Sequence, residues 1–136
     1  MAMSLQVRIM TPDRIFWSAQ AEEIILPTNT GQMGVLTNHT PLITALDIGV
    51  MLVRSENEWI SMALMGGFAL IKDNQIIILV NEAEQASTIE AEEAETSFLA
   101  AKQALEAAEG RKDRIEANLV FKRARARYQI ATQNPM

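Results

Sequence analysis

The sequence predicts a β-sandwich or flattened barrel followed by an α-helical hairpin of two antiparallel helices. Residues 4–80 consist of short apolar runs separated by turn-forming residues, which is typical of an antiparallel β-domain. Residues 86–133 are rich in alanine, with apolar side chains three or four positions apart, which is typical of helices. We therefore expect a sandwich domain over residues 1–85 and a two-helix domain over residues 86–136.

The strands of the sandwich are expected in sequence order. The first has Leu5, Val7 and Ile9 alternating with polar residues, and Pro27 is expected to stop a strand over 23–26. A turn at Asp73-Asn74 joins the last two strands. The continuous apolar run 76–80 predicts a strand buried on both faces. The other expected strands cover residues 15–17, 50–54, 59–65, 68–72 and 75–80.

Two helices are expected after the last strand. Ser87 and Glu90 have the spacing of a capping box at the start of the first helix, and Gly110 is expected to end it. The second helix should run from about Lys112 to Ile130. The first helix has one apolar seam, formed by Ala91, Ala94, Phe98, Ala101, Leu105 and Ala108.

The second helix has two apolar stripes instead of one. One stripe is Ala117, Phe121, Ala124, Tyr128 and Ala131, and the other is Ile115, Leu119, Ala126 and Ile130. Two stripes indicate two packing partners, either at once or in alternative conformations. The second stripe could equally well cover the sandwich.

Charge is distributed unevenly along the chain. The net charge is −5, so the whole chain gives no reason to expect a nucleic acid or an anionic membrane as partner. Residues 82–109 have eight acidic side chains and one basic side chain, whereas residues 111–127 have seven basic and two acidic ones. No apolar run reaches the roughly 20 residues that span a bilayer, so no direct membrane insertion is expected. The N-terminus lacks the pattern of a signal peptide.

Catalytic and metal-binding patterns are weak. The chain has one histidine, His39, and no cysteine, so neither a histidine-based zinc site nor a Cys–His pair can form. The glycines lack the Lys-Ser/Thr that follows in a phosphate loop. The clustered glutamates at 90–95 should form a solvated helix face. We expect no enzyme activity, no metal and no cofactor.

Several motifs, taken together, resemble the ε subunit of F-type ATP synthases, with plastid and cyanobacterial members the most similar. They follow in order over nearly the whole chain, at residues 23–28, 31–41, 63–69, 78–81 and 122–127. The resemblance implies the fold expected above. It also implies a non-catalytic rotor subunit, peripheral on an energy-coupling membrane, that helps couple proton-driven rotation to ATP synthesis.

The resemblance implies partners for each domain. The sandwich would bind the γ subunit and rest on the c-ring, with His39 and a loop containing Gly31, Gln32, Met33 and Gly34 facing these partners. The helices would either fold against the sandwich or extend into the α/β catalytic head and inhibit ATP hydrolysis. In the extended state, the basic residues Lys122, Arg123, Arg125 and Arg127 would meet acidic residues of the β subunits.

Two further hypotheses concern ligands. Some relatives bind ATP through a motif that opens the first helix, and here that segment is Ile89-Glu90-Ala91-Glu92-Glu93-Ala94. Because Glu93 stands where an arginine is needed, we expect no nucleotide binding, although Arg123 and Arg127 could still contact phosphate. The alternative function is a stand-alone sandwich module whose basic helix binds polyanions. The acidic first helix and the lack of interleaved aromatic residues argue against nucleic acid.

Overall fold

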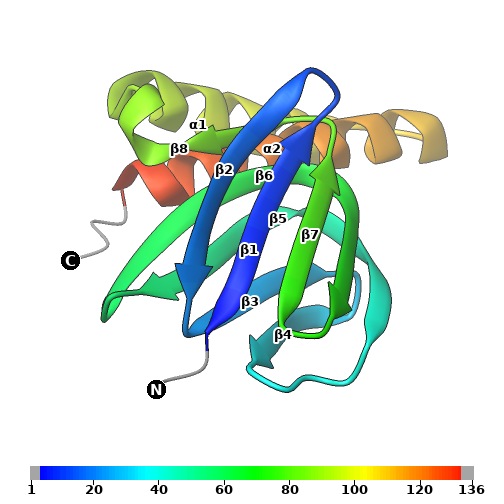
Figure 1. The fold of residues 1–136 in the computed structure, drawn as a ribbon. Helices are drawn as coiled ribbons and strands as arrows, with labels where there is room; N and C mark the ends of the chain where they lie inside the picture. The colour runs from blue at the N-terminus through cyan, green and yellow to red at the C-terminus, as the bar shows by residue number, and fades with distance from the viewer. Residues whose placement is uncertain (1–3, 133–136) are drawn as a thin grey trace.

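The computed structural model describes residues 4–132 and contains a β-sandwich with a helical hairpin against one side (Figure 1). One mixed sheet, with β1 and β7 parallel and the other pairs antiparallel, folds over to form both layers. Its strand order is β2-β1-β7-β6-β5-β3-β4, with β8 paired to β6. The strands are β1 (Leu5–Thr11), β2 (Arg14–Ala21), β3 (Glu23–Thr28), β4 (Gly31–Leu36), β5 (Leu42–Ser55), β6 (Glu58–Lys72), β7 (Gln75–Val80) and β8 (Ala83–Gln85). The predicted fold class is confirmed.

The long strands β5 and β6 hold the two layers together, since one half of each pairs in each layer. Their ladder runs from Leu42 opposite Ile71 to Ser55 opposite Glu58. Inward-facing aliphatic side chains fill the space between the layers, and they are shielded from water along their whole length. Members of this core include Leu5, Val7, Ile9, Ile24, Leu26, Val35, Met51, Val53, Met62, Leu64, Ile76 and Ile78.

Gly67 allows β6 to pass close to β7. Its φ is +149°, and a Cβ atom there would lie 2.0 Å from the carbonyl oxygen of Leu79. No other residue fits that approach without moving the backbone. The Asp73-Asn74 turn has φ values of 53° and 61°, as the two-residue hairpin requires.

Four sequence-based details of the sandwich are wrong. The strands expected over 59–65 and 68–72 are one continuous strand, β6. Pro27 does not stop β3. It lies where the β3–β5 register shifts, so β5 requires no backbone N–H donor at that position. The segment Gly31–Gly34 is not a loop but the first part of β4, paired with β3. Ile76–Val80 is not buried on both faces, since Leu79 is 43% exposed and faces outward.

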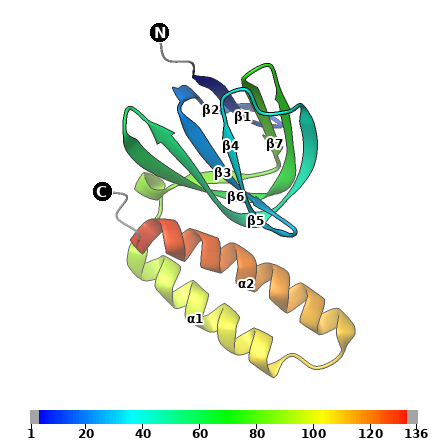
Figure 2. The ribbon, with the colours of Figure 1, turned by 90° about the horizontal axis from the view of Figure 1, so that it is seen from below.

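The hairpin consists of α1 (Ala91–Ala107) and α2 (Arg111–Thr132), which lie antiparallel (Figure 2). The ring of Phe98 on α1 stacks on Tyr128 with centroids 5.0 Å apart and lies 5.6 Å from Phe121. Ala94 and Ala101 are buried in the same seam. The first predicted stripe of α2 therefore packs against α1.

The predicted helix ends differ from the observed ones. The capping box at Ser87 does not form: residues Ala86–Thr88 form a 3-10 turn, η1, and α1 begins only after Glu90. The reason is tertiary contact, because Ile89 packs in extended conformation against α2 before the helix can begin. At the other end α1 stops at Ala107, and Gly110, with φ of +83°, turns the chain into α2.

Candidate functional site

The hairpin contacts the sandwich through the C-terminal half of α2. Ala126 and Ile130 are buried against Ala63 of β6, with Ala86 and Ile89 packed beside them. The small side chains at 63 and 126 let the helix lie close to the strand. This small cluster is separate from the main core of the sandwich, so the hairpin is attached by limited apolar contact.

Two ion pairs join α2 to the sandwich beside this apolar cluster. Lys122 Nζ lies 3.0 Å from Asp47 Oδ2 in the middle of β5. Arg123 makes a two-pronged contact with Glu82, in which Nη1 and Nη2 donate to the two carboxylate oxygens at 2.6 and 2.8 Å. Planar, paired hydrogen bonds of this kind fix orientation as well as adding charge attraction.

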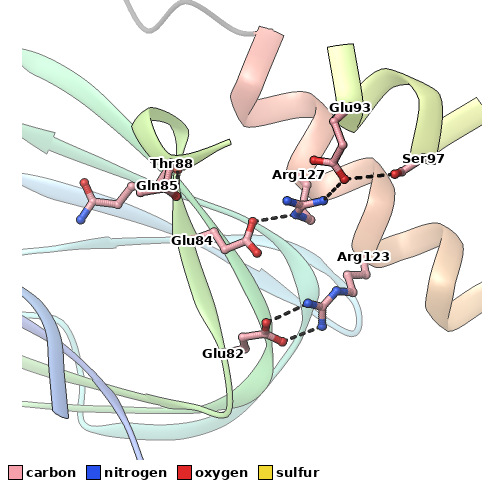
Figure 3. A network of polar contacts seen from close by, with 8 residues as sticks. All are labelled: Glu82, Glu84, Gln85, Thr88, Glu93, Ser97, Arg123 and Arg127. Atoms are coloured by element: carbon pink, nitrogen blue, oxygen red, sulfur yellow. Dashed lines mark hydrogen bonds and ion pairs between the residues drawn. The ribbon is translucent and has the colours of Figure 1, made fainter. Parts of the chain in front are cut away.

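A third pair involves Arg127, one helical turn further along (Figure 3). Its Nε donates to Glu84 Oε2 at 2.7 Å, and its Nη1 lies 3.5 Å from Glu93 Oε1 on α1. Arg127 therefore connects α2 to both β8 and α1. We refer to Lys122–Asp47, Arg123–Glu82 and Arg127–Glu84 together as the docking ion pairs.

The docking ion pairs shift the pKa values of three of their members. The hydrogen bond from Arg123 lowers the pKa of Glu82, and this effect exceeds the opposing effect of partial burial. Hydrogen bonds to Glu82 and Glu84 raise the pKa values of Arg123 and Arg127, respectively. All these shifts favour the charged forms that attract one another.

The four basic residues assigned to the inhibitory helix have different surroundings. Lys122, Arg123 and Arg127 are paired with sandwich carboxylates, whereas the guanidinium carbon of Arg125 lies 5.2 Å from the centre of the Phe121 ring. Only the C-terminal half of the second apolar stripe of α2 packs against the sandwich. Ala126 and Ile130 are buried, while Ile115 and Leu119 are 54% and 51% exposed beyond the edge of the sandwich.

The residues predicted to face the c-ring and γ lie at two places on the sandwich. Gly31, Gln32 and Gly34 are exposed on β4, near the turn that follows β3. His39 comes after the far end of that strand, where the backbone N–H of Asn38 donates to Asn74 Oδ1 at 2.6 Å. Since β4 extends by about 3.3 Å per residue, Gly31 lies roughly 16 Å from the end of the strand that leads to His39, and Gly34 lies roughly 7 Å from it.

The remnant of the nucleotide motif is occupied by internal contacts. Glu93 accepts a hydrogen bond from Ser97 and pairs with Arg127, and Ala94 is buried. Ile89 packs under α2 and Glu90 precedes α1. The carboxylate of Glu93 thus holds the arginine that a phosphate group would need.

An apolar surface that the sequence patterns did not predict lies on the outside of the sandwich. Side chains on four strands form it: Ile15 on β2, Ile43 on β5, Phe68 on β6 and Leu79 on β7, each between 43% and 71% exposed. Phe68 and Leu79 are directly opposite each other in the ladder. We call this set the outer apolar face. The pattern that could have predicted it is alternation: in these strands every second side chain enters the core, and the apolar side chains between them point outward.

The fold and the interface define a two-domain protein in which a sandwich holds a helical hairpin by ion pairs and a small apolar contact. Two family models match it: the ATP synthase δ/ε chain β-sandwich domain over residues 4–86 and the δ/ε chain long α-helix domain over residues 87–132. The chain therefore belongs to the ATP synthase δ/ε chain family, as the resemblance of its motifs predicted.

Individual relatives agree with this assignment. The chain is 74% identical over 130 residues to the chloroplastic ATP synthase ε chain of Nephroselmis olivacea, covering 96% of this chain and 98% of that one. It is 70% identical to the chloroplastic ε chain of Chlorella vulgaris, with the same coverage. Its fold also matches a chain in the structure of the Euglena gracilis mitochondrial ATP synthase, OSCP/F1/c-ring, with a TM-score of 0.79 and 21% identity, covering 92% of this chain and 79% of that one.

Two properties of the described residues bear on membrane insertion and metal binding. Neither helix within residues 4–132 is long and apolar enough to cross a membrane. In the same residues, no group of three or more His, Cys, Asp or Glu side chains is placed to hold a metal ion.

Proposed function

We propose that this chain is a non-catalytic rotor subunit of a chloroplast-type ATP synthase, and that its hairpin regulates ATP hydrolysis by leaving the sandwich. The observation that supports this most directly is the pairing of Lys122, Arg123 and Arg127 with carboxylates of the sandwich. The same cations cannot contact the catalytic head while these pairs persist. The docked hairpin is then the permissive state, and the released hairpin is the inhibitory one.

The outer apolar face is the proposed contact with the γ subunit. A contiguous set of large exposed apolar side chains on a sandwich marks a partner surface. Obligate interfaces are more apolar than transient ones, and γ would be an obligate partner. The exposed residues Gly31 and Gln32 of β4, together with His39, would then lie toward the c-ring. Solved relatives in the F1/c-ring assembly of Euglena gracilis and the central stalk and c-ring of Tetrahymena thermophila support these partners by their fold.

The proposed location is the stromal side of the thylakoid membrane. Relatives named as chloroplastic ε chains support a plastid location for the complex. The chain would reach the membrane only through its partners. The alternative, a stand-alone module that binds polyanions, is disfavoured because the sandwich carboxylates already neutralise three of the cations such a module would offer.

The test is neutralisation of the sandwich side of the docking ion pairs. The triple variant Asp47→Asn, Glu82→Gln, Glu84→Gln keeps all four cations of α2 but removes their docked partners. Reconstituted complex with this variant should hydrolyse ATP more slowly than with the native chain, because the hairpin is released more often. The matched control is Glu58→Gln, Glu106→Gln, Glu116→Gln, which changes net charge equally at exposed positions. Equal hydrolysis rates with the two variants would contradict the proposal.

A further inference from the structure

One edge of β6 is open beside the interface. β8 pairs with β6 only over Met62 to Leu64, with Gln85 opposite Met62 as the last partner. The part of β6 before that point, Glu58–Ser61, pairs with β5 on one side and has no strand of residues 4–132 on the other. A groove of about 730 Å³ lies there, lined by residues 57–61 and by Gln85, Ala86 and Ser87.

The segment that follows β8 does not continue along this edge but turns away from it. After Gln85, residues Ala86–Thr88 form the 3-10 turn η1, which Figure 3 shows coiling back beside Thr88. The turn is held by a backbone bond of 3.2 Å from Ile89 to Ala86 and by the Thr88 hydroxyl, which donates to the Gln85 carbonyl at 2.9 Å. Gln85, Ile89 and Glu90 on either side are already extended.

We propose that the open edge of β6 is an acceptor site for the chain's own linker, and that Ala86–Thr88 converts from the 3-10 turn into an extension of β8 when the hairpin leaves the sandwich. We assign this segment to the open edge of β6 because it is covalently joined to β8 at the point where the β6–β8 ladder stops. Only three residues change conformation. The inference rests on the proposed function only in requiring that the hairpin can leave.

The register of the extended strand follows from the existing one. Glu84 is opposite Ala63 and Gln85 opposite Met62, so Ala86 comes opposite Ser61 and Thr88 opposite Trp59. The backbone bond from Met65 to the Glu82 carbonyl shows that odd-numbered residues of β6 direct their N–H and C=O groups to this edge. The main-chain groups of Ser61 and Trp59 therefore face the incoming strand.

Residues at the open edge gain partners in this register. Ser61, whose buried hydroxyl makes no hydrogen bond to any described residue of the docked chain, would pair through its main chain with Ala86. Thr88 would also be directly opposite Trp59, a β-branched and aromatic pair that stabilises antiparallel ladders.

The extended strand and the docked hairpin exclude each other. In the docked state Ala86 and Ile89 pack against the cluster of Ala63, Ala126 and Ile130. Extension removes Ile89 from that contact, because Ile89 comes opposite Glu58 and faces the other side of the sheet, whereas Ala86 stays on the face of Ala63. It also lengthens the linker, because strand residues rise about 3.3 Å each against about 2.0 Å in a 3-10 turn, so the start of α1 moves by about 4 Å. Strand extension would thus hold the hairpin in its released state.

The experiment traps the extended strand with a disulfide in the isolated full chain, which has no cysteine of its own. The variant Trp59→Cys, Thr88→Cys places two thiols at directly paired positions, where the Cα separation of about 5.5 Å suits a disulfide. The control Trp59→Cys, Ser87→Cys is one residue out of register, so its thiols lie on opposite faces. We expect oxidation of the first variant and not of the second. The oxidised form should lose the methyl–methyl NMR contacts between Ala63 and Ile130, and reduction should restore them.

Two proline variants, each added to the Trp59→Cys, Thr88→Cys chain, test the turn itself. Ala86→Pro fits the first position of the 3-10 turn after an extended residue but removes the N–H that faces Ser61, so cross-linking should be lost. Ser87→Pro disfavours helical geometry at Ala86 and removes an N–H that points away from β6, so cross-linking should be faster. Equal cross-linking in the two proline variants, oxidation of the out-of-register control, or an oxidised form that keeps the Ala63–Ile130 contacts would each overturn the inference. Because no ATP synthase is present, these results are independent of the hydrolysis test.

Discussion

The guanidinium of Arg123 bridges both carboxylate oxygens of Glu82, at 2.6 and 2.8 Å, and so joins the middle of α2 to the residue that precedes β8. Both side chains are nearly half exposed. An exposed pair of this kind contributes about 0–1 kcal/mol. Together with the two less exposed docking ion pairs, Lys122–Asp47 and Arg127–Glu84, it surrounds a small apolar contact. The attachment is specific in geometry and limited in area.

The first prediction concerns acidity. The Arg123 hydrogen bond lowers the pKa of Glu82 below its usual 4.5, so the pair contributes stability above that pH and loses it as the pH falls through the lower, folded value. Docking of the hairpin should therefore weaken below about pH 4.5. The measurement is the methyl NMR contact between Ala63 and Ile130 during an acid titration. Glu82→Gln should start from weaker docking and show a shallower dependence on pH; a titration identical to that of the native chain would refute this role.

The second prediction concerns the apolar contact. Ile130 is fully buried between α2 and the sandwich, so Ile130→Ala should cost about 2–5 kcal/mol of docking and local stability. Ile115→Ala, on the exposed part of the same helix, should change stability by about 0.5 kcal/mol or less. Thermal unfolding followed separately for hairpin and sandwich signals checks both. Equal effects of the two substitutions would contradict the assignment of Ile130 to the interface.

The third prediction concerns nucleotide. Glu93 pairs with Arg127, so millimolar ATP should leave the melting temperature of the native chain unchanged. Glu93→Arg removes the carboxylate that occupies Arg127 and adds a second cation, and it should increase the affinity for ATP. Calorimetry measures both. Micromolar binding by the native chain, or no gain in the variant, would contradict this interpretation of the degenerate motif.

How far the sequence predicted this structure depends on the range of the interaction concerned. Local patterns predicted the Asp73-Asn74 turn, the seam around Phe98 and the sequence of a sandwich followed by two helices, but not β4, β8 or the continuity of β6. The Ser87 cap failed because Ile89 is drawn into a contact with Ile130, about forty residues away, which no local pattern records. The prediction that Pro27 ends a strand was wrong because the register between β3 and β5 shifts there, and so no N–H is needed at that position.

The candidate site shows the same division. The basic residues of α2 were recognisable from their density, but their partners Asp47, Glu82 and Glu84 come from β5 and from the segment around β8, brought together only by the fold. The outer apolar face was hidden for a different reason. Leu79 lies in a run whose alternate members form the core, and the apolar run looks the same whichever face is buried.

The last prediction separates the roles of the two domains and of the individual cations. Truncation after Gln85 should leave a folded sandwich, because the main core contains no residue of the hairpin. This fragment should bind γ and support coupled synthesis but should no longer inhibit ATP hydrolysis. Single substitutions of the cations of α2 should differ in whether they release the hairpin. Arg125 has no docking carboxylate, so Arg125→Ala should reduce inhibition without releasing the hairpin.

Arg123→Ala should both release the hairpin and remove a cation that acts in the head, so its net effect on inhibition should be smaller than that of Arg125→Ala. Both changes preserve helicity, since alanine is the best helix former. The triple change Arg123→Ala, Arg125→Ala, Arg127→Ala should approach the effect of truncation, because it removes three of the four cations together. The measurements are ATP hydrolysis by the reconstituted complex and the Ala63–Ile130 contact in the isolated chain. If the truncated chain inhibits hydrolysis as strongly as the full chain, then the hairpin is not the inhibitor, and the docking ion pairs serve only to hold it in place.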